Sequence, residues 1–578
     1  MSLTGAMNIG RSALNASSLG IQIAGNNMAN AATPGYSRQR GILSSLRGDG
    51  TPLGMSIGSG VRMQAIQRQV DEALQTRLRA SNSNSAAADT LSSVYSQVET
   101  VLGELGDADL SSELSSFFRV WSERANQTKS SASVVQQGDK LAQFIRRVRS
   151  DLSGQRTQVD AQLDGSVARA NELLSTIANV SQQIQETEFG GNPANTLRDQ
   201  RDQALEQLSQ LMEVSVVDRG AQGYDVLVGS TPVVMGSQSR GIELRRETGA
   251  SGLNISIRVA SSGQQLGINS GSVGALLDSR DDAVDGTINA LDDLSGQLIF
   301  EVNKLHSTGI PQNWLTSTGS TMRISAPDRT RAMNDAGNQA FGDLPFRAVN
   351  GGFIVNVRDT TTRAVTSVRI NVDLDGINSA GQPGTTDDTT AQQLADAMAA
   401  IPGLSASIAP NGQFQVSSLP GYEFTFADDT SGALGTLGLN AYFTGTDASD
   451  IAVRSDLAND PSRLSSGRMV NGQLVENGTA LALAGLQTTT VQGLSNRSIA
   501  DAWRDTAQQV GARASAFSSD ADAAFIVKDS LEGQRSAISG VSIDEESISL
   551  LDYQRQYQAA ARVISVAQEM TNTLLQLI

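Results

Sequence analysis

Apolar residues recur at helical spacing at both ends of the chain, and this pattern restricts the possible fold more than any other feature. Near the N-terminus the stripe is made of Leu3, Met7, Leu14, Ile21 and Met28. Near the C-terminus it is made of Ile543, Leu550, Tyr553, Tyr557, Ile564, Leu574 and Ile578. Such spacing places side chains on one face of an α-helix. A long helix of this kind is stable only when that face is packed, so each end predicts a helix that needs a partner.

The interior alternates between long helical patterns and β-rich runs. Apolar periodicity predicts helices over residues 70–105, 133–188, 197–212, 277–305 and 499–531. At about 214–270 and 346–445, β-branched and aromatic runs are separated by glycine, asparagine and proline, which is typical of strands and turns. The predicted fold class is α+β and multidomain, with an elongated helical coiled-coil or bundle stem formed by both chain ends and β-rich middle domains.

The same order predicts three domains in the 578 residues. They are a terminal helical domain (1–60 with 541–578), a long-helix bundle domain that includes the β-rich segment at about 214–270 (61–312 with 451–540), and an inserted β-rich outer domain (313–450). Within the inserted domain, residues 387–401 predict a short helix with an aspartate or threonine near its N-terminal cap.

Composition excludes several classes of function. The net charge of −17 opposes binding to nucleic acid. The chain has no cysteine, and His306 is its only histidine, which excludes thiolate nucleophiles, histidine-dependent triads and cysteine-ligated zinc. No stretch approaches the roughly 18 apolar residues of a membrane span, and residues 1–11 do not resemble a cleaved secretory signal. We therefore expect no enzymatic activity, no cofactor, no metal and no membrane insertion.

A distinctive turn follows the N-terminal stripe. It consists of Asn26, Asn27 and Asn30, followed by Thr33, Pro34, Gly35 and Tyr36. Pro34 disfavours helical geometry at Thr33, and Gly35 permits a positive φ, so the first helix must end here. Tyr36 is then available as an anchor for the redirected chain.

These residues resemble the N-terminal signature of bacterial flagellar axial proteins, the rod, hook and hook-associated family. In that family an amphipathic helix ends in an Asn-Asn-x-Ala-Asn segment and a Thr-x-Gly-Tyr turn, which residues 26–30 and 33–36 match. Residues 540–578 are similar to the closing helix of the same family, except that Ser542 and Ser549 stand where the family commonly has asparagine. The segments that resemble the hook-associated members are 197–214, 271–282, 303–309 and 477–487.

The resemblance implies a structural component of the flagellum that joins the hook to the filament. Its terminal helices would build the inner tube, with the two stripes and the turn residues packing between subunits. The implied partners are further copies of the chain in a ring, the hook protein, a second hook–filament junction protein and an export chaperone at the C-terminal helix. The implied route is the flagellar type III pathway without a cleaved signal, from the cytoplasm to the extracellular flagellum.

An isolated terminal helix rich in serine, asparagine and glycine is marginal in water. We therefore expect the two ends to be poorly ordered in the free subunit and to become rigid as they pack between neighbours. Assembly would then supply the apolar burial that a solitary chain lacks.

Two alternative functions stay open. One is another axial protein such as the hook subunit, against which the predicted long helices at 133–188 and 499–531 argue. The other is a carbohydrate-binding or hydrolase module within 313–450, a segment in which no paired catalytic groups occur at an interpretable spacing.

Isolated polar motifs favour structural interpretations. His306 lies near the end of a predicted helix, where an imidazole can interact with terminal carbonyl groups. Asn371, Asp373, Asp375 and Gly376 match positions 1, 3, 5 and 6 of a calcium-binding loop. Position 12 would be Gln382 rather than a bidentate glutamate, so a solvated hairpin turn is favoured. The pair Asp387 and Asp388 is expected on a solvated face.

Overall fold

The computed structural model describes residues 3–47, 58–103, 109–189, 193–220, 223–249, 252–342, 344–470 and 473–576. The chain forms two compact units. Unit 1 contains residues 1–93, 159–279 and 515–578, and unit 2 contains residues 94–158 and 280–514. The division falls within the helices α2 (Glu72–Leu102), α4 (Ser131–Glu188) and α12 (Ile499–Ser539). The α+β, multidomain class is confirmed, while the division into three domains stays a prediction.

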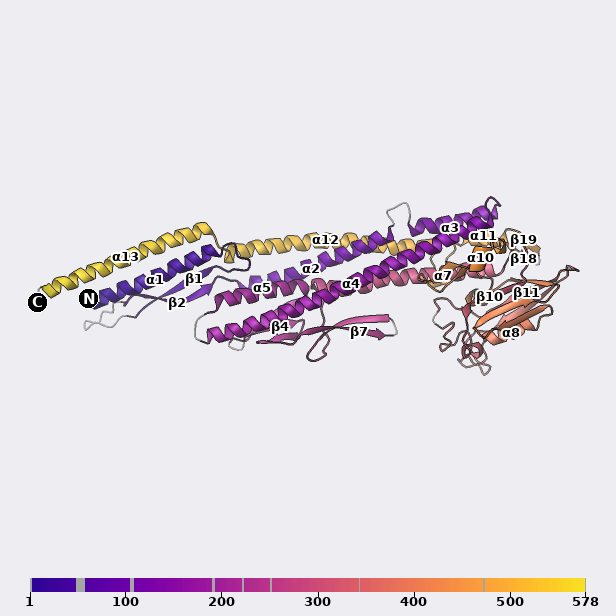
Figure 1. Ribbon diagram of the computed structural model, residues 1–578, viewed down its shortest axis with the longest axis horizontal. Coiled ribbons are helices and arrows are strands. Elements are labelled where there is room, and N and C mark those ends of the chain that lie inside the picture. The colour runs from indigo at the N-terminus through magenta and orange to yellow at the C-terminus, as the bar shows by residue number, and fades with distance from the viewer. Residues whose placement is uncertain are drawn as a thin grey trace. The chain divides into compact units, whose positions relative to one another are not determined.

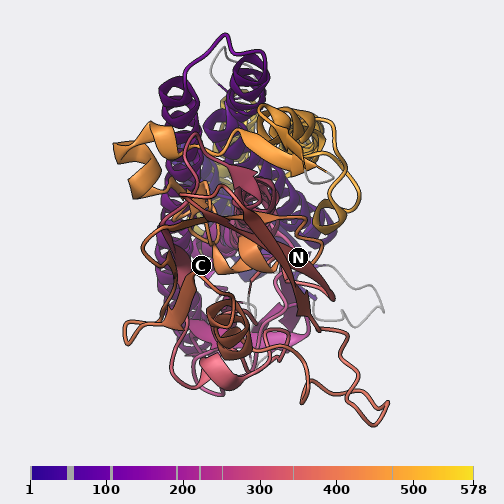
Figure 2. The ribbon, with the colours of Figure 1, turned by 90° about the vertical axis from the view of Figure 1, so that its right-hand side faces the viewer.

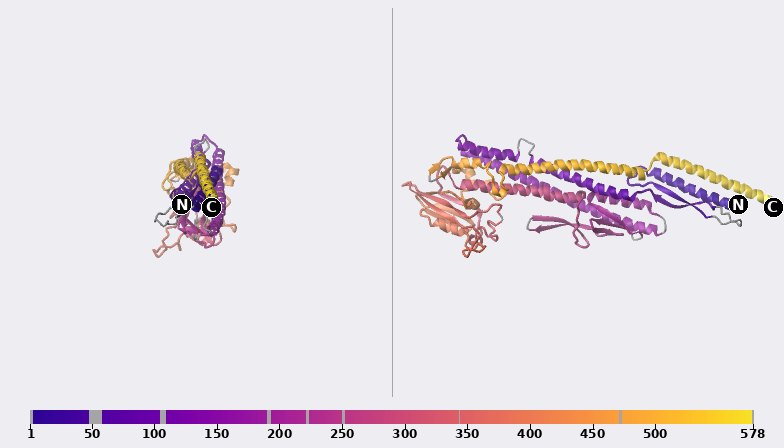
Figure 3. Two further views of the ribbon diagram at one scale, coloured as in Figure 1. Left: turned by 90° about the vertical axis from the view of Figure 1, so that its left-hand side faces the viewer. Right: turned by 180° about the vertical axis from the view of Figure 1, so that it is seen from behind.

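The two ends of the chain pair within unit 1. Helix α1 (Leu3–Ala29) runs alongside α13 (Ile543–Gln576) in the opposite direction (Figures 1 and 3). The antiparallel strands β1 (Gln39–Ser45) and β2 (Val61–Arg68) form a ribbon that contacts α1. Because α1 ends at Ala29, the predicted stop of the first helix before the turn is confirmed.

The rest of unit 1 combines helices with two small antiparallel sheets. Its further elements are the later part of α4, α5 (Asn195–Leu211), β3 (Val214–Asp218), β4 (Tyr224–Val228), β5 (Thr231–Met235), β6 (Gln238–Ser239), β7 (Ile242–Gly249), β8 (Gly252–Val259) and α6 (Gly271–Ser279). One sheet has the order β3-β4-β5-β6, and the other is the hairpin β7-β8. Asn171 joins α4 to β7, since its amide donates to the carbonyl of Ile242 at 2.8 Å and accepts the Ile242 N–H at 2.9 Å.

Unit 2 packs helices around an aromatic cluster. Its main helices are α3 (Leu110–Ala125), the first part of α4, α7 (Gly286–Ser307), α11 (Gly478–Gly485) and the start of α12. The rings of Phe117, Trp121 and Tyr442 contact one another with centroid distances of 5.5–6.3 Å and are almost fully buried. The Tyr442 hydroxyl donates to the carbonyl of Val134 at 2.8 Å.

Strands of unit 2 surround a second core. Two three-stranded antiparallel sheets are built from β10 (Ser317–Arg323), β14 (Gln413–Ser418) and β13 (Leu404–Ile408), and from β12 (Val365–Val372), β11 (Gly351–Asp359) and β15 (Tyr422–Ala427). Figure 2 shows these strands, in dark red to orange, with α8 (Ala391–Ala399) among them. The buried side chains of both sheets and of α8, including Phe353, Phe414 and Leu394, form one cluster.

Short elements complete unit 2. They are β9 (Gly309–Ile310), α9 (Ala433–Leu437), β16 (Phe443–Thr444), β17 (Ala452–Val453), α10 (Ser455–Asn459), β18 (Gly467–Val470), β19 (Gln473–Val475), the π-helix η2 (Arg280–Asp285) and the 3-10 helices η3 (Asp328–Thr330), η4 (Pro461–Arg463) and η5 (Gln492–Leu494). The helix predicted over 277–305 is therefore wrong in one respect, because η2 separates α6 from α7. At this break the buried guanidinium of Arg280 pairs with Asp285 at 2.9 Å.

The other predicted elements agree closely with the structure. The helices expected over 70–105, 133–188, 197–212 and 499–531 are confirmed as α2, α4, α5 and α12. The short helix expected in 387–401 is confirmed as α8, and Thr390 and Gln393 form a reciprocal capping box at its start. Helix α3 was not predicted. Among the described residues, none of the helices combines the length and apolar character that a membrane crossing requires.

Candidate assembly surface at the chain ends

Two glycines of α1 let α13 approach closely. A Cβ at Gly20 would lie 2.6 Å from ring carbons of Tyr553, and a Cβ at Gly10 would lie 2.7 Å from Cγ1 of Ile564. Real Cβ atoms do not approach other atoms this closely, so only glycine permits this helix separation. Tyr553 and Ile564, both predicted packing residues, therefore lie in the seam between α1 and α13.

The other predicted stripe residues divide between this seam and the surface. Six of them are half-buried within the single chain, namely Leu3, Met7, Leu14, Ile21, Met28 and Leu550. Ile543, Tyr557 and Leu574 are largely exposed. Ile578 lies outside the described residues. Pairing of the two ends thus covers the N-terminal stripe partly and leaves several C-terminal stripe positions open.

An apolar face of α13 is also exposed, and of its residues only Leu574 was predicted to pack. It consists of Ile548, Leu551, Val563, Val566, Met570 and Leu574, whose residue surfaces are 45–62% exposed. Val566 precedes the buried Ala567 by one residue and so points about 100° away from it around the helix. We call these six residues the open face of α13. A search for two apolar faces rather than one would have found it in the sequence.

Asn27 is the centre of the turn network. Its side chain is buried, and its amide nitrogen donates to the carbonyl of Gln39 at 2.9 Å and to Oε2 of Glu546 at 3.0 Å. Its oxygen accepts from the Tyr36 hydroxyl at 2.8 Å and from the Gln39 N–H at 3.0 Å. This one amide therefore connects α1, the turn, β1 and the first turn of α13.

Arg38 reinforces the same junction. Its Nε donates to Oε1 of Glu546 at 2.7 Å, and its Nη1 donates to Oε2 of Glu545 at 2.8 Å. Burial is the main cause that raises the pKa of Tyr36 to about 12, so its hydroxyl stays a donor at neutral pH. Arg38 and Glu546 were not among the predicted packing residues, although the acidic run at 544–546 was a signal that a cation lies opposite.

The remaining turn residues lie at the surface. Asn30 donates to the carbonyl and the side-chain oxygen of Asn26, both at 2.9 Å, which closes the end of α1 locally. Pro34 and Gly35 are exposed, and Gly35 has a φ of 79°, as its predicted conformation requires. Within the single chain these four residues shape the turn rather than fill a core.

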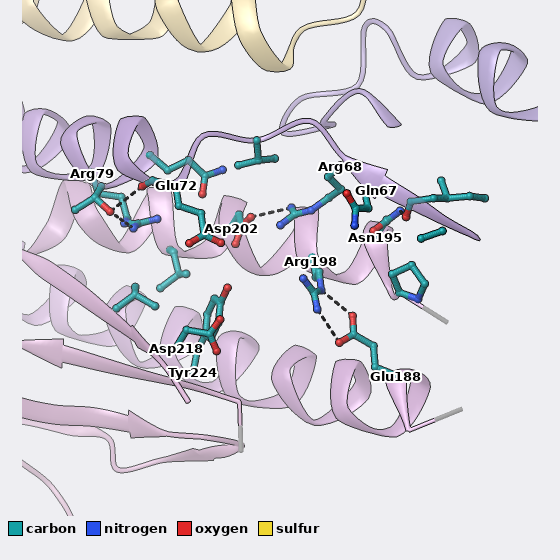
Figure 4. Close-up of a pocket in the computed structure, with 18 residues that line it drawn as sticks. Gln67, Arg68, Glu72, Arg79, Glu188, Asn195, Arg198, Asp202, Asp218 and Tyr224 are labelled. Atoms are coloured by element: carbon teal, nitrogen blue, oxygen red, sulfur yellow. Dashed lines mark hydrogen bonds and ion pairs between the residues drawn. The ribbon is translucent and has the colours of Figure 1, made fainter. Parts of the chain in front are cut away.

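A polar pocket of about 550 Å³ lies elsewhere in unit 1, lined by β2, α2, α4, α5 and β4 (Figure 4). Arg68 donates to Asp199 at 2.9 Å and to Asp202 at 2.8 Å. Arg198 makes two 2.7 Å hydrogen bonds to the carboxylate of Glu188, and these hold the pKa of Glu188 below its usual value. The paired charges lock β2, α4 and α5 together, which is a structural role.

His306 is fully buried in unit 2 and has a defined tautomer. Its Nδ1 lies 2.8 Å from the carbonyl of Asn440 and must donate, while its Nε2 accepts the Ser465 N–H at 3.1 Å. Burial is the main cause that lowers its pKa to about 4, so the ring is neutral. The structural interpretation is confirmed, but the expected carbonyl partner is wrong, because it belongs to Asn440 and not to the end of α7.

Two domain families match this chain. The flagellar hook-associated protein FlgK helical domain matches residues 95–321. The C-terminal domain of flagellar basal body rod FlgEFG proteins matches residues 533–577. The second match covers all of α13 and the end of α12, and the first covers the helices α3 to α7. Together they define a flagellar axial protein.

Two relatives by sequence carry the same protein name. Flagellar hook-associated protein 1 of Salmonella typhimurium is 26% identical over 98% of this chain and 99% of its own length. The protein of the same name from Bacillus subtilis is 32% identical over 36% of this chain and 42% of its own length. The structure of the flagellar hook junction protein FlgK from Burkholderia pseudomallei has a TM-score of 0.46 and 16% identity, covering 80% of this chain and all of that one. This chain is therefore similar along nearly its whole length to flagellar hook-associated protein 1, and its helical interior matches the FlgK helical domain.

Proposed function

We propose that this protein is a structural subunit at the junction between the flagellar hook and filament, and that it polymerises through α1 and α13. Copies of the chain form a ring in the axial structure, next to the hook protein on one side and a second junction protein on the other. The name of the relatives and the FlgK helical domain support this role over that of a hook subunit. An outer-domain carbohydrate-binding or hydrolase activity has no supporting observation.

The open face of α13 is the observation that carries the proposal. Six apolar side chains of α13 remain exposed although α1 packs along the same helix. Burying one large aliphatic side chain contributes roughly 1.5–3 kcal/mol, so their burial between subunits is a strong driving force for assembly. The first helix lacks an open face of this size, since Leu19, at 38%, is the one exposed large apolar residue on its described part.

The same face explains the proposed export partner. Before assembly, exposed side chains such as Val566 and Met570 invite aggregation. A chaperone that binds the C-terminal helix in the cytoplasm would cover them until the subunit leaves through the flagellar type III pathway. Release of the chaperone would then uncover the surface that joins the polymer.

A single charge on the open face tests the proposal. Val566→Asp places a carboxylate where we expect burial between subunits, so the variant should not enter the junction and the cells should lack attached filaments. Gln568→Asp introduces the same group at an exposed polar position of the same helix and should assemble normally. Imaging of hook ends in a deletion strain complemented with each variant measures incorporation.

Two results would contradict the proposed function. The first is normal junctions in cells that carry only Val566→Asp. The second is equal failure of both variants, which would trace the defect to added charge on α13 and not to the open face. Amide hydrogen exchange of the purified variants checks that α1 and α13 still pair.

A further inference from the structure

Three carboxylates meet in unit 2 at the base of the loop that joins β12 to α8. Asp373 and Asp375 follow β12 and Asp388 precedes α8, and one oxygen of each lies within 4.8 Å of the others. The backbone closes this base, because the Thr389 N–H donates to the carbonyl of Asp373 at 2.7 Å and the Asp373 N–H donates to Oγ1 of Thr389 at 2.8 Å. The carboxylates are therefore held together by the fold itself.

Asp388 is the unusual member of this group. Its residue surface is 1% exposed, which makes the prediction of a solvated face wrong for Asp388. Its Oδ2 accepts from the amide of Asn334 at 2.6 Å, but its Oδ1 is buried without a hydrogen-bond donor among the described residues. The side-chain oxygen of Asn334 is buried without a donor as well. A buried carboxylate oxygen without a partner costs free energy unless a cation or a proton compensates it.

Repulsion between the three carboxylates adds to this free-energy cost. Three carboxylates with oxygens within 4.8 Å repel one another when all are ionised. In the part of the chain that the structure describes, none of the three forms an ion pair with arginine or lysine. Among the described residues, no basic side chain therefore compensates the charge of these three carboxylates.

We propose that Asp373, Asp375 and Asp388 bind one divalent cation, Ca²⁺. Carboxylate oxygens are the ligands that Ca²⁺ prefers, at about 2.4 Å, so two oxygens on opposite sides of the ion lie about 4.8 Å apart. The three oxygens lie no farther apart than this distance. Water and nearby carbonyl groups complete the coordination of such sites. Oδ1 of Asp388 then has a partner, and the ion neutralises the repulsion.

This site is not the calcium-loop motif seen in the sequence. Asn371, the first position of that motif, lies within β12 opposite Gly352. The carbonyl of Gln382, at the twelfth position, accepts the Asn378 N–H at 2.8 Å. The third carboxylate comes instead from Asp388, which the motif does not include.

Calcium titration of the full-length chain tests the site. After removal of metal with EDTA, isothermal titration with CaCl₂ at constant ionic strength should show saturable binding of one ion per chain. Thermal unfolding followed by tryptophan fluorescence should shift to higher temperature in CaCl₂, because a ligand that binds only the folded state stabilises it. MgCl₂ should bind more weakly, since Mg²⁺ requires shorter distances and near-octahedral geometry.

Three variants locate the ion. Asp375→Asn, at an exposed position, should weaken Ca²⁺ binding at least tenfold while circular dichroism stays unchanged. Asp388→Asn should abolish binding and raise the unfolding temperature in EDTA, because it removes a buried charge that has no compensation there. Asp387→Asn removes the same charge from the exposed neighbour and should keep the affinity within twofold.

The proposal is overturned if wild-type protein shows no saturable binding up to about 10 mM CaCl₂, which exceeds the dissociation constants of the weakest extracellular calcium modules. It is also overturned if Asp387→Asn weakens binding as much as Asp375→Asn does, because Ca²⁺ affinity would then depend on the net negative charge of the loop and not on specific ligands. Equal or tighter binding of Mg²⁺ would contradict the assignment to Ca²⁺.

Discussion

At the scale of single residues, His306 shows how a buried side chain makes stability depend on pH. Its Nε2 accepts a backbone N–H, so a proton on that atom would replace an acceptor with a second donor. The nearby Arg454 and Asp456 act on its pKa in opposite directions, and burial remains the main cause of the low value. In the folded protein the His306 ring is therefore neutral, whereas in the unfolded chain it takes up a proton near the ordinary histidine pKa of about 6.5.

We expect unit 2 to lose stability as the pH falls from about 6.5 to about 4. In that window the unfolded state binds the proton and the folded state does not, which lowers the free energy of unfolding by on the order of 3 kcal/mol. All three tryptophans, Trp121, Trp314 and Trp503, belong to unit 2, so denaturant unfolding followed by tryptophan fluorescence reports this unit.

His306→Gln is the matched variant, because its amide has both a donor and an acceptor but does not titrate. It should show a flatter dependence of stability on pH between 4 and 6.5 than the wild type does. Parallel curves for the two proteins would mean that other groups, such as the acidic side chains, cause the loss.

Gly20 is the second residue whose role can be measured alone. Gly20→Ala should destabilise the α1–α13 pair by about 1–3 kcal/mol, because the new Cβ meets the Tyr553 ring. Gly25→Ala lies in the same helix with no atom within 4 Å of the new Cβ, and should stabilise α1 by up to about 1 kcal/mol. Hydrogen exchange of the α13 amides measures both. Equal protection in the two variants would contradict the close approach at Gly20.

At the scale of elements, apolar periodicity was sufficient for the long helices and insufficient where one is interrupted. The stripe of 277–305 continues through the π-helix η2, where Arg280 is buried beside Asp285, and an apolar pattern does not report a buried arginine. The seam residues Tyr553 and Ile564 followed from spacing, because they face one direction. The roles of Asn27 and Glu546 did not, since a hydrogen bond between residues 519 positions apart has no local signal.

The terminal helices should be the least stable elements of the free subunit. Both helices are formed in the structure and pack against each other. The gain of rigidity that we expect on assembly therefore applies to the α1–α13 pair and not to each helix separately. We expect the amides of α1 and α13 to exchange faster than those of α4, which has buried apolar residues along most of its length. Exchange as slow as in α4, measured in dilute wild-type protein, would show that the ends are already rigid before assembly.

At the scale of the whole molecule, each compact unit has its own internal contacts. We therefore expect a chain without residues 541–578 to keep unit 2 folded, with its tryptophan emission and unfolding midpoint unchanged, and to be excluded from the polymer. The full-length chain under the same conditions is the control. Loss of the unit 2 transition in the truncated chain would contradict this independence.

The fold class and the order of helices and strands were predictable from the sequence because they depend on local pattern. The hydrogen bond of Asn27 to Glu546 and the approach of Asp388 to Asp373 were not. Each of these depends on residues that are distant in sequence and are brought together only by the tertiary fold.

The hydrogen bond between Asn27 and Glu546, which are 519 positions apart, has a consequence for biosynthesis. A polypeptide whose translation stops before α13 can fold unit 2, yet it leaves the glycine-containing side of α1 bare and never acquires the open face. If the proposed function holds, such truncated products would be excluded from the polymer without a separate inspection step, because they lack the face that we expect to bind neighbouring subunits.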